Sequence, residues 1–136
     1  MIIHRHGDIV LFYAEESLLY QVATWVRGEG RMSLRLVSSR DPVIVARSLE
    51  DAVVAIIDAT RRPGEAMAAL ERCLRRLGAR QTAIYSEQMH HGLELFARVR
   101  SVQLLMGPMS PPEWDAFFEP FESFAVPLRR QEEQVG

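Results

Sequence analysis

Residues 53–63 read Val-Val-Ala-Ile-Ile-Asp-Ala-Thr-Arg-Arg-Pro, and this stretch decides how the rest of the chain is interpreted. Its first five residues are apolar without a break, which is typical of a strand buried on both faces of a parallel sheet. Asp58 follows at the carboxyl end of that strand. In open α/β sheets this edge is where ligands and reactive groups gather. We therefore expect Asp58 to mark the functional edge of the domain.

The remaining sequence alternates strand patterns with helix patterns around this central strand. Strands are predicted over residues 8–13, 33–38, 53–57, 82–86 and 102–106, and helices between and after them, one of them marked by Met89, Leu93 and Phe96. Alternating elements with short connections predict a three-layer α/β/α flavodoxin-like fold, with a five-stranded parallel sheet in the order 2-1-3-4-5 and five helices. A single domain over residues 1–136 is expected, with a core of about 8–122 and a frayed tail over 128–136.

Composition excludes several classes of protein. The chain is 48% hydrophobic and 25% charged with a net charge of −2, as in ordinary soluble domains, and this charge predicts neither nucleic-acid nor membrane binding. The start of the chain has no apolar core of the signal-peptide kind, so a cytoplasmic location is expected. All 16 basic side chains are arginines, and the sequence contains no lysine.

Residues at the predicted strand ends resemble the pattern of response-regulator receiver domains over roughly residues 8–122. That family carries an acidic pair after its first strand, and Glu15 and Glu16 follow the first strand here. It carries a phosphoacceptor aspartate after its third strand, where this chain has Asp58, and a threonine or serine at the end of its fourth strand, where this chain has Ser86. The resemblance implies the flavodoxin-like fold and a role in two-component signal transduction.

Two positions depart from the family pattern. Gly107 stands where the family has its lysine, and Leu104 stands where it has its aromatic switch residue. Because the chain has no lysine at all, another register cannot restore that side chain. Phosphotransfer needs the developing charge to be neutralised. The sequence therefore favours an atypical receiver-like module (a pseudo-receiver) that is not an enzyme and acts by protein–protein interaction without aspartyl phosphotransfer.

The acidic residues allow two interpretations. By resemblance, Glu15, Glu16 and Asp58 would converge and hold Mg²⁺, although the longer glutamates suit its strict octahedron poorly, so only weak Mg²⁺ binding and no other cofactor is expected. In the alternative, the two glutamates begin the first helix, where carboxylates suit the helix dipole. Asp58 is then held by Arg61, by Arg62 or by backbone amides.

A partner surface is expected near the end of the chain. The last predicted helix follows a Ser110–Glu113 capping box and carries Trp114, Phe117, Phe118 and Phe121 at helical spacing. Four large rings exceed what a short helix usually buries, so part of this surface should be exposed. We expect an interface formed by Leu93, Phe96, Trp114, Phe117 and Phe118. The partner would be a histidine kinase, another signalling protein or a second copy of the chain.

Two other functions stay open from the sequence. The first is a genuine response-regulator receiver that accepts phosphate on Asp58 with Mg²⁺. The second is a small-molecule-binding flavodoxin-like protein or enzyme, which would need a Gly-rich or Ser/Thr-rich loop after the first or third strand. A metal site made from His4, His6, His90 and His91 is not favoured, because no carboxylate lies at a suitable spacing.

Overall fold

The computed structural model describes residues 7–29 and 32–122 of the chain. Strands and helices alternate along it, as predicted. The elements are β1 (Asp8–Phe12), α1 (Glu16–Glu29), β2 (Ser33–Val37), α2 (Pro42–Ser48), β3 (Ala52–Asp58), α3 (Pro63–Leu77), the 3₁₀ turn η1 (Ala79–Gln81), β4 (Thr82–Ser86), α4 (Leu93–Val99) and β5 (Gln103–Met106). Residues 111–122 form a further helix, called the final helix below. None of the helices in these described ranges is long and apolar enough to cross a membrane.

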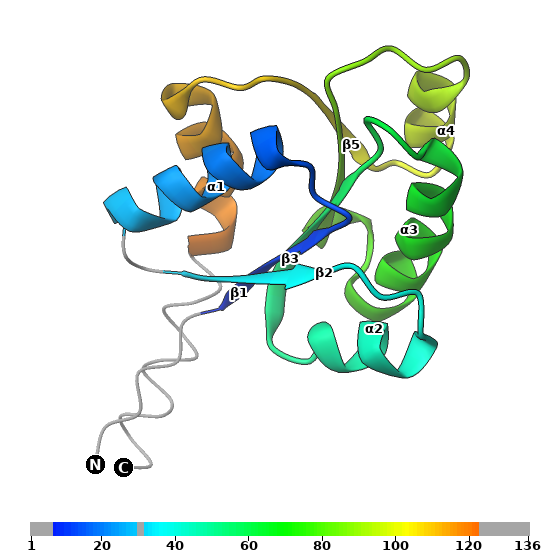
Figure 1. The fold of residues 1–136 in the computed structure, drawn as a ribbon, viewed down its shortest axis with the longest axis horizontal. Helices are drawn as coiled ribbons and strands as arrows, with labels where there is room; N and C mark the ends of the chain where they lie inside the picture. The colour runs from blue at the N-terminus through cyan, green and yellow to red at the C-terminus, as the bar shows by residue number, and fades with distance from the viewer. Residues whose placement is uncertain (1–6, 30–31, 123–136) are drawn as a thin grey trace.

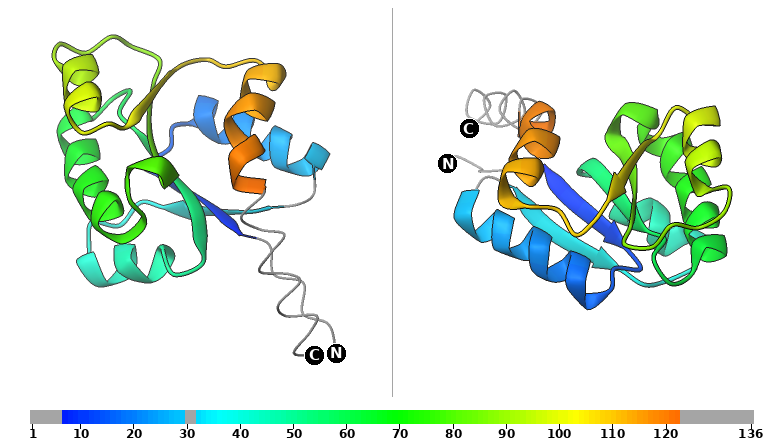
Figure 2. Two further views of the ribbon diagram at one scale, coloured as in Figure 1. Left: turned by 180° about the vertical axis from the view of Figure 1, so that it is seen from behind. Right: turned by 90° about the horizontal axis from the view of Figure 1, so that it is seen from above.

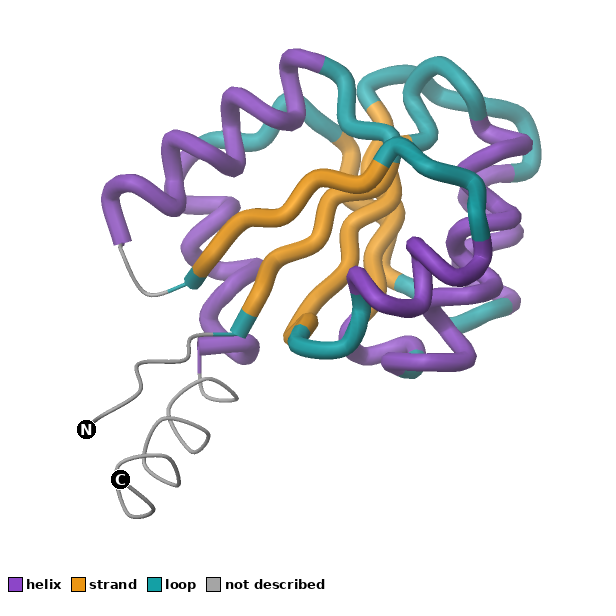
Figure 3. Tube along the Cα trace, turned by 60° about the horizontal axis from the view of Figure 1, so that its bottom comes forward, coloured by secondary structure: helices purple, strands orange, loops and turns teal. Residues whose placement is uncertain are grey.

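The five strands form one parallel sheet in the order β2-β1-β3-β4-β5, which confirms the predicted topology (Figures 1 and 3). β3 lies at the centre and pairs with β1 on one side and β4 on the other. Its residues 53–58 are all buried. The unbroken apolar run is explained as predicted, because helices cover both faces of the strand.

Helices cover the two faces unequally. Figure 2 shows α1 and the final helix on one side of the sheet, and α2, α3 and α4 on the other. Alternate residues of β1 serve the two layers: Ile9 and Leu11 pack in the cluster under α1, while Val10 and Phe12 pack in the cluster under α2 and α3. This alternation follows from the two-residue period of a strand.

Side chains at the starts of two helices cap the free backbone amides there. Asp41 caps α2, because its Oδ1 accepts a hydrogen bond from the Val43 amide at 2.9 Å. Ser110 and Glu113 form the expected capping box, in which the Ser110 amide donates to Glu113 Oε1 at 3.0 Å and the Glu113 amide donates to Ser110 Oγ at 3.4 Å. These bonds satisfy amides that a helix start leaves without partners.

The prediction for the fourth helix is wrong at its start. Met89 precedes α4 and is exposed, and α4 begins only at Leu93, after Gly92 with φ 84°. The left-handed backbone at Gly92 separates the loop from the helix, so helical spacing does not extend back to Met89. The predicted tail over 128–136 lies outside the described residues.

Candidate functional site

The carboxyl ends of β1 and β3 meet at one edge of the sheet, because these strands are neighbours. Asp58 ends β3 there with only 3% of its surface exposed. Its Oδ2 accepts a hydrogen bond from the Glu15 amide at 3.0 Å, and its Oδ1 accepts one from the Thr60 amide at 2.9 Å. The sequence allowed Asp58 to be held by Arg61, by Arg62 or by backbone amides, and the structure shows the backbone amides. Each oxygen of the carboxylate therefore holds the backbone of one loop, the loop after β1 or the loop after β3.

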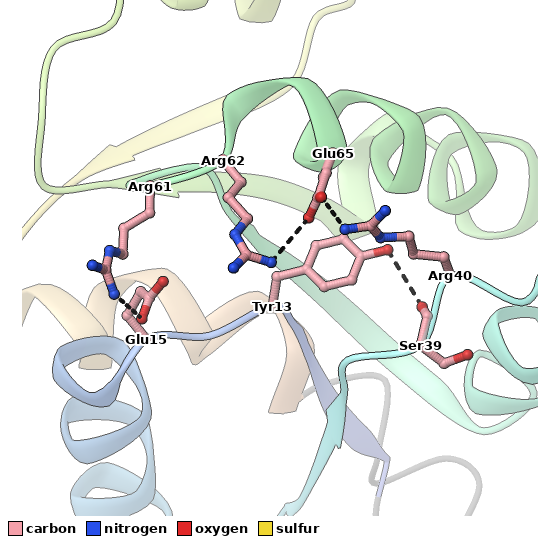
Figure 4. Close-up of polar contacts among 7 residues, drawn as sticks. All are labelled: Tyr13, Glu15, Ser39, Arg40, Arg61, Arg62 and Glu65. Atoms are coloured by element: carbon pink, nitrogen blue, oxygen red, sulfur yellow. Dashed lines mark hydrogen bonds and ion pairs between the residues drawn. The ribbon is translucent and has the colours of Figure 1, made fainter.

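The expected convergence of three carboxylates on a metal site is not found. The backbone amide of Glu15 faces Asp58, while its carboxylate lies 3.7 Å from Arg61 Nη1 (Figure 4). Glu16 is exposed and begins α1. Among the residues that the structure describes, no three His, Cys, Asp or Glu side chains are placed to hold a metal ion. Glu16 thus lies apart from the predicted ligand set, while Glu15 and Asp58 line one pocket, and weak Mg²⁺ binding there stays a prediction.

Ser86 is buried at the end of β4, and its hydroxyl is used within the following turn. Its Oγ donates to the Gln88 carbonyl oxygen at 2.6 Å and accepts from the Gln88 amide at 3.2 Å. Beside it, Thr60 Oγ1 accepts a hydrogen bond from the Glu87 amide at 3.1 Å, and His90 Nε2 donates to the Thr60 carbonyl oxygen at 2.8 Å. The loops after β3 and β4 are therefore bonded to each other.

Gly107, at the position of the family's lysine, has no room for a side chain. A Cβ atom built there would lie 2.2 Å from the Tyr85 hydroxyl and 2.4 Å from Tyr85 Cζ. Tyr85 belongs to β4 and is fully buried, so its ring cannot move aside into solvent. Leu104, at the aromatic switch position, is half-buried and packs against the cluster under α3. The space of the missing lysine is thus taken by the Tyr85 ring.

The Tyr85 hydroxyl belongs to a polar network that the sequence patterns did not predict. It accepts a hydrogen bond from Gln21 Nε2 at 2.8 Å and donates one to the Glu87 carboxylate. Gln21 Oε1 in turn accepts from the Met109 amide at 2.8 Å and from Trp114 Nε1 at 3.2 Å. Burial, and then the Glu87 bond, raise the pKa of Tyr85 well above its usual value, so the hydroxyl stays protonated. The sequence feature that points to this network is Gly107, because a residue without a side chain leaves room there for the Tyr85 ring.

The prediction of an exposed aromatic surface is wrong. Trp114, Phe117, Phe118 and Phe121 are all buried, and so is Leu93, while Phe96 is half-buried. The rings pack with one another and with Trp25 of α1, whose centroid lies 4.3 Å from that of Phe118. They therefore form the core between α1 and the sheet. The large apolar side chains that α4 exposes are Leu95 and Val99, one helical turn apart.

Comparison with family models and with the sequences of curated proteins gives no match. Solved structures do match. A putative pilus assembly-related protein from Burkholderia pseudomallei aligns with a TM-score of 0.64 at 20% identity, over 90% of this chain and 94% of that chain. A CheY-like response regulator from Mesorhizobium loti aligns with a TM-score of 0.62 at 16% identity, over 86% and 99%. This chain has the fold of a receiver domain.

A pseudo-receiver domain is also among these matches. The pseudo-receiver domain of CikA aligns with a TM-score of 0.54 at 14% identity, over 85% of this chain and 96% of that chain. At these identities the likeness concerns the fold, and the receiver-like fold expected from the strand-end residues is confirmed.

The contact between Gly107 and Tyr85 gives a first prediction. Gly107→Ala should destabilise the domain by about 1–3 kcal/mol, because its methyl group overpacks against a buried ring. Urea unfolding measures the change. Gly64→Ala is the matched control, since a Cβ at Gly64 meets nothing within 4 Å and alanine favours the helix. Equal stability of the two variants would contradict this packing.

Proposed function

We propose that this chain is an atypical receiver-like signalling module that acts by protein–protein interaction and does not accept phosphate on its central aspartate. The observation that carries the proposal is the pair of backbone hydrogen bonds on the Asp58 carboxylate. In this arrangement Asp58 serves the fold at the position where a receiver would place its phosphoacceptor.

Energetics support this proposal. Each Asp58 oxygen keeps a second lone pair, but a rotation of the carboxylate that aims one oxygen at a phosphoryl donor would break its bond to the Glu15 amide or the Thr60 amide. An amide left unsatisfied in a buried place costs about 1–3 kcal/mol. The compensation that a lysine would offer is absent, because the Tyr85 ring fills the space beside Gly107. Developing negative charge on the phosphoryl group would therefore lack the lysine that the family pattern places after the fifth strand.

A partner surface is proposed on α4. Leu95 and Val99 are 61% and 71% exposed and share one helix face, where four-residue spacing places side chains together. Exposed apolar side chains of this kind favour a protein contact. A histidine kinase, another signalling protein or a second copy of the chain is the proposed partner.

A phosphorylatable receiver is the second candidate, because Asp58 ends the central strand of a receiver fold. Treatment with acetyl phosphate and Mg²⁺, followed by intact-protein mass spectrometry, separates the two. We expect no stoichiometric phosphoryl adduct, and no difference between the wild type and Asp58→Asn. A stoichiometric adduct that Asp58→Asn abolishes would overturn the proposal and favour the second candidate.

Substitution of Asp58 should affect stability. Asp58→Asn should destabilise the domain by roughly 1–3 kcal/mol, because the asparagine amide group cannot accept from the Glu15 and Thr60 amides together. Asp41→Asn is the control, since its carboxylate accepts a single cap bond, which asparagine can also accept. The measurement is urea unfolding of both variants. If Asp58→Asn were as stable as Asp41→Asn, the structural role of Asp58 would be refuted.

A further inference from the structure

A polar pocket of about 260 Å³ lies beside Asp58 at the carboxyl edge of the sheet. Three arginines line it: Arg40 comes from the segment between β2 and α2, and Arg61 and Arg62 come from the segment between β3 and α3 (Figure 4). The family pattern described above assigns no role to these arginines. Two loops that are distant in sequence thus bring three guanidinium groups to one pocket.

Two of these arginines, Arg61 and Arg62, have only loose partners inside this pocket. Arg61 Nη1 lies 3.7 Å from Glu15 Oε2, and Arg62 Nη1 lies 3.6 Å from Glu65 Oε2. Both separations exceed a hydrogen-bond length. Within the described residues neither arginine donates a hydrogen bond, and the side chains of Arg61 and Arg62 are 72% and 69% exposed. Exposed pairs of this kind contribute at most about 1 kcal/mol each.

The remaining charges of the pocket engage Arg40 but leave Arg61 and Arg62 loosely paired. Arg40 is hydrogen-bonded to Glu65, so this one carboxylate is shared between Arg40 and Arg62. Asp58 also lines the pocket, yet both of its oxygens accept backbone amides. The pocket therefore holds guanidinium donors whose capacity for hydrogen bonds is mostly unused.

We propose that Arg40, Arg61 and Arg62 bind a small phosphate-type dianion without any covalent step. One guanidinium group can donate two parallel hydrogen bonds to the oxygens of a phosphate. Such bidentate, charge-assisted bonds are stronger than exposed ion pairs with carboxylates. A dianion between the loops replaces the long contacts that Arg61 and Arg62 make with Glu15 and Glu65. The carboxylates of Glu15 and Glu65 then lose their arginine contacts, but both are already partly exposed and can be solvated by water.

The size of the pocket sets the ligand class. Its volume of about 260 Å³ falls below the range of roughly 300–1,000 Å³ typical of sites for drug-sized ligands. Inorganic phosphate or a phosphate monoester of a few carbon atoms fits within this volume. The proposal rests on the proposed function, since it supplies a non-covalent input at the edge where a working receiver would use phosphotransfer.

Isothermal titration calorimetry of the full chain tests this proposal, with EDTA present and ionic strength held constant with chloride. The probes are inorganic phosphate and glycerol 3-phosphate, which separate the free anion from a monoester. We expect saturable binding of at least one probe. Arg61→Gln and Arg62→Gln should each weaken it about ten- to a hundredfold, because each loses charge-assisted hydrogen bonds.

A variant of the same pocket that changes the affinity in the opposite direction makes the test specific. Glu65→Gln should tighten binding severalfold, because it removes a carboxylate that competes for Arg40 and Arg62. Arg98→Gln is the matched control and should leave affinity unchanged, since Arg98 pairs with Glu94 on α4 and does not line the pocket. Circular dichroism verifies that each variant is folded.

Failure of this proposal can be distinguished from failure of the proposed function. Absence of saturable binding, or equal affinity of the wild type and both arginine variants, would overturn the anion site and leave the absence of phosphotransfer untouched. A weaker affinity of Glu65→Gln would also overturn it, because the competing role of this carboxylate would be refuted. A covalent phosphoryl adduct on Asp58 would be seen by mass spectrometry, independently of the calorimetry.

Discussion

The carboxylate of Asp58 holds together the two loops that form the functional edge of the sheet. It accepts one amide from the loop after β1 and one from the loop after β3. Hydrogen bonds to an ionised acceptor are stronger than those between neutral groups, and here they satisfy two amides in a partly buried place. From Thr60 the connection continues to the loop after β4, because Thr60 bonds both the Glu87 amide and the His90 ring.

Tyr85 links this edge of the sheet to the helix layer that α1 and the final helix form. Its hydroxyl binds Gln21 of α1 and Glu87, and Gln21 binds the start of the final helix through Trp114. The ring needs the space beside Gly107, so the glycine and the tyrosine depend on each other. A lysine restored at position 107 would therefore clash with the core before it could reach the edge of the sheet. Asp58 and Ser86, which match the receiver pattern in sequence, are used here in hydrogen bonds to loop backbone.

Much of the fold follows from local sequence patterns. The apolar run of residues 53–57 specifies a strand covered on both faces, and alternation of strands and helices then leaves few parallel topologies. The cap at Asp41 and the box at Ser110 also depend on neighbours within three residues, so they were predictable. The position of Asp58 at the strand end follows from the same short-range information.

The rest depends on contacts between distant residues. The orientation of Glu15 is set by loop torsions, and these turn its amide, and not its carboxylate, toward Asp58. Burial of Phe118 needs Trp25 of α1, which lies far away in the sequence. The approach of Tyr85 to Gly107 follows from the pairing of β4 with β5, where Tyr85 lies opposite Leu105. A sequence alone indicates the residue types at these positions but not which of their atoms meet.

The central claim is that Asp58 is a structural acceptor of backbone amides and not a metal-binding phosphoacceptor. NMR spectroscopy of the amide groups of Glu15 and Thr60 during a titration with Mg²⁺ tests it most directly. The account predicts that both amides are protected from hydrogen exchange and that their resonances do not move as Mg²⁺ is added. Saturable shifts of both resonances together with loss of protection would show that the carboxylate leaves its amides for the metal, and would contradict the account.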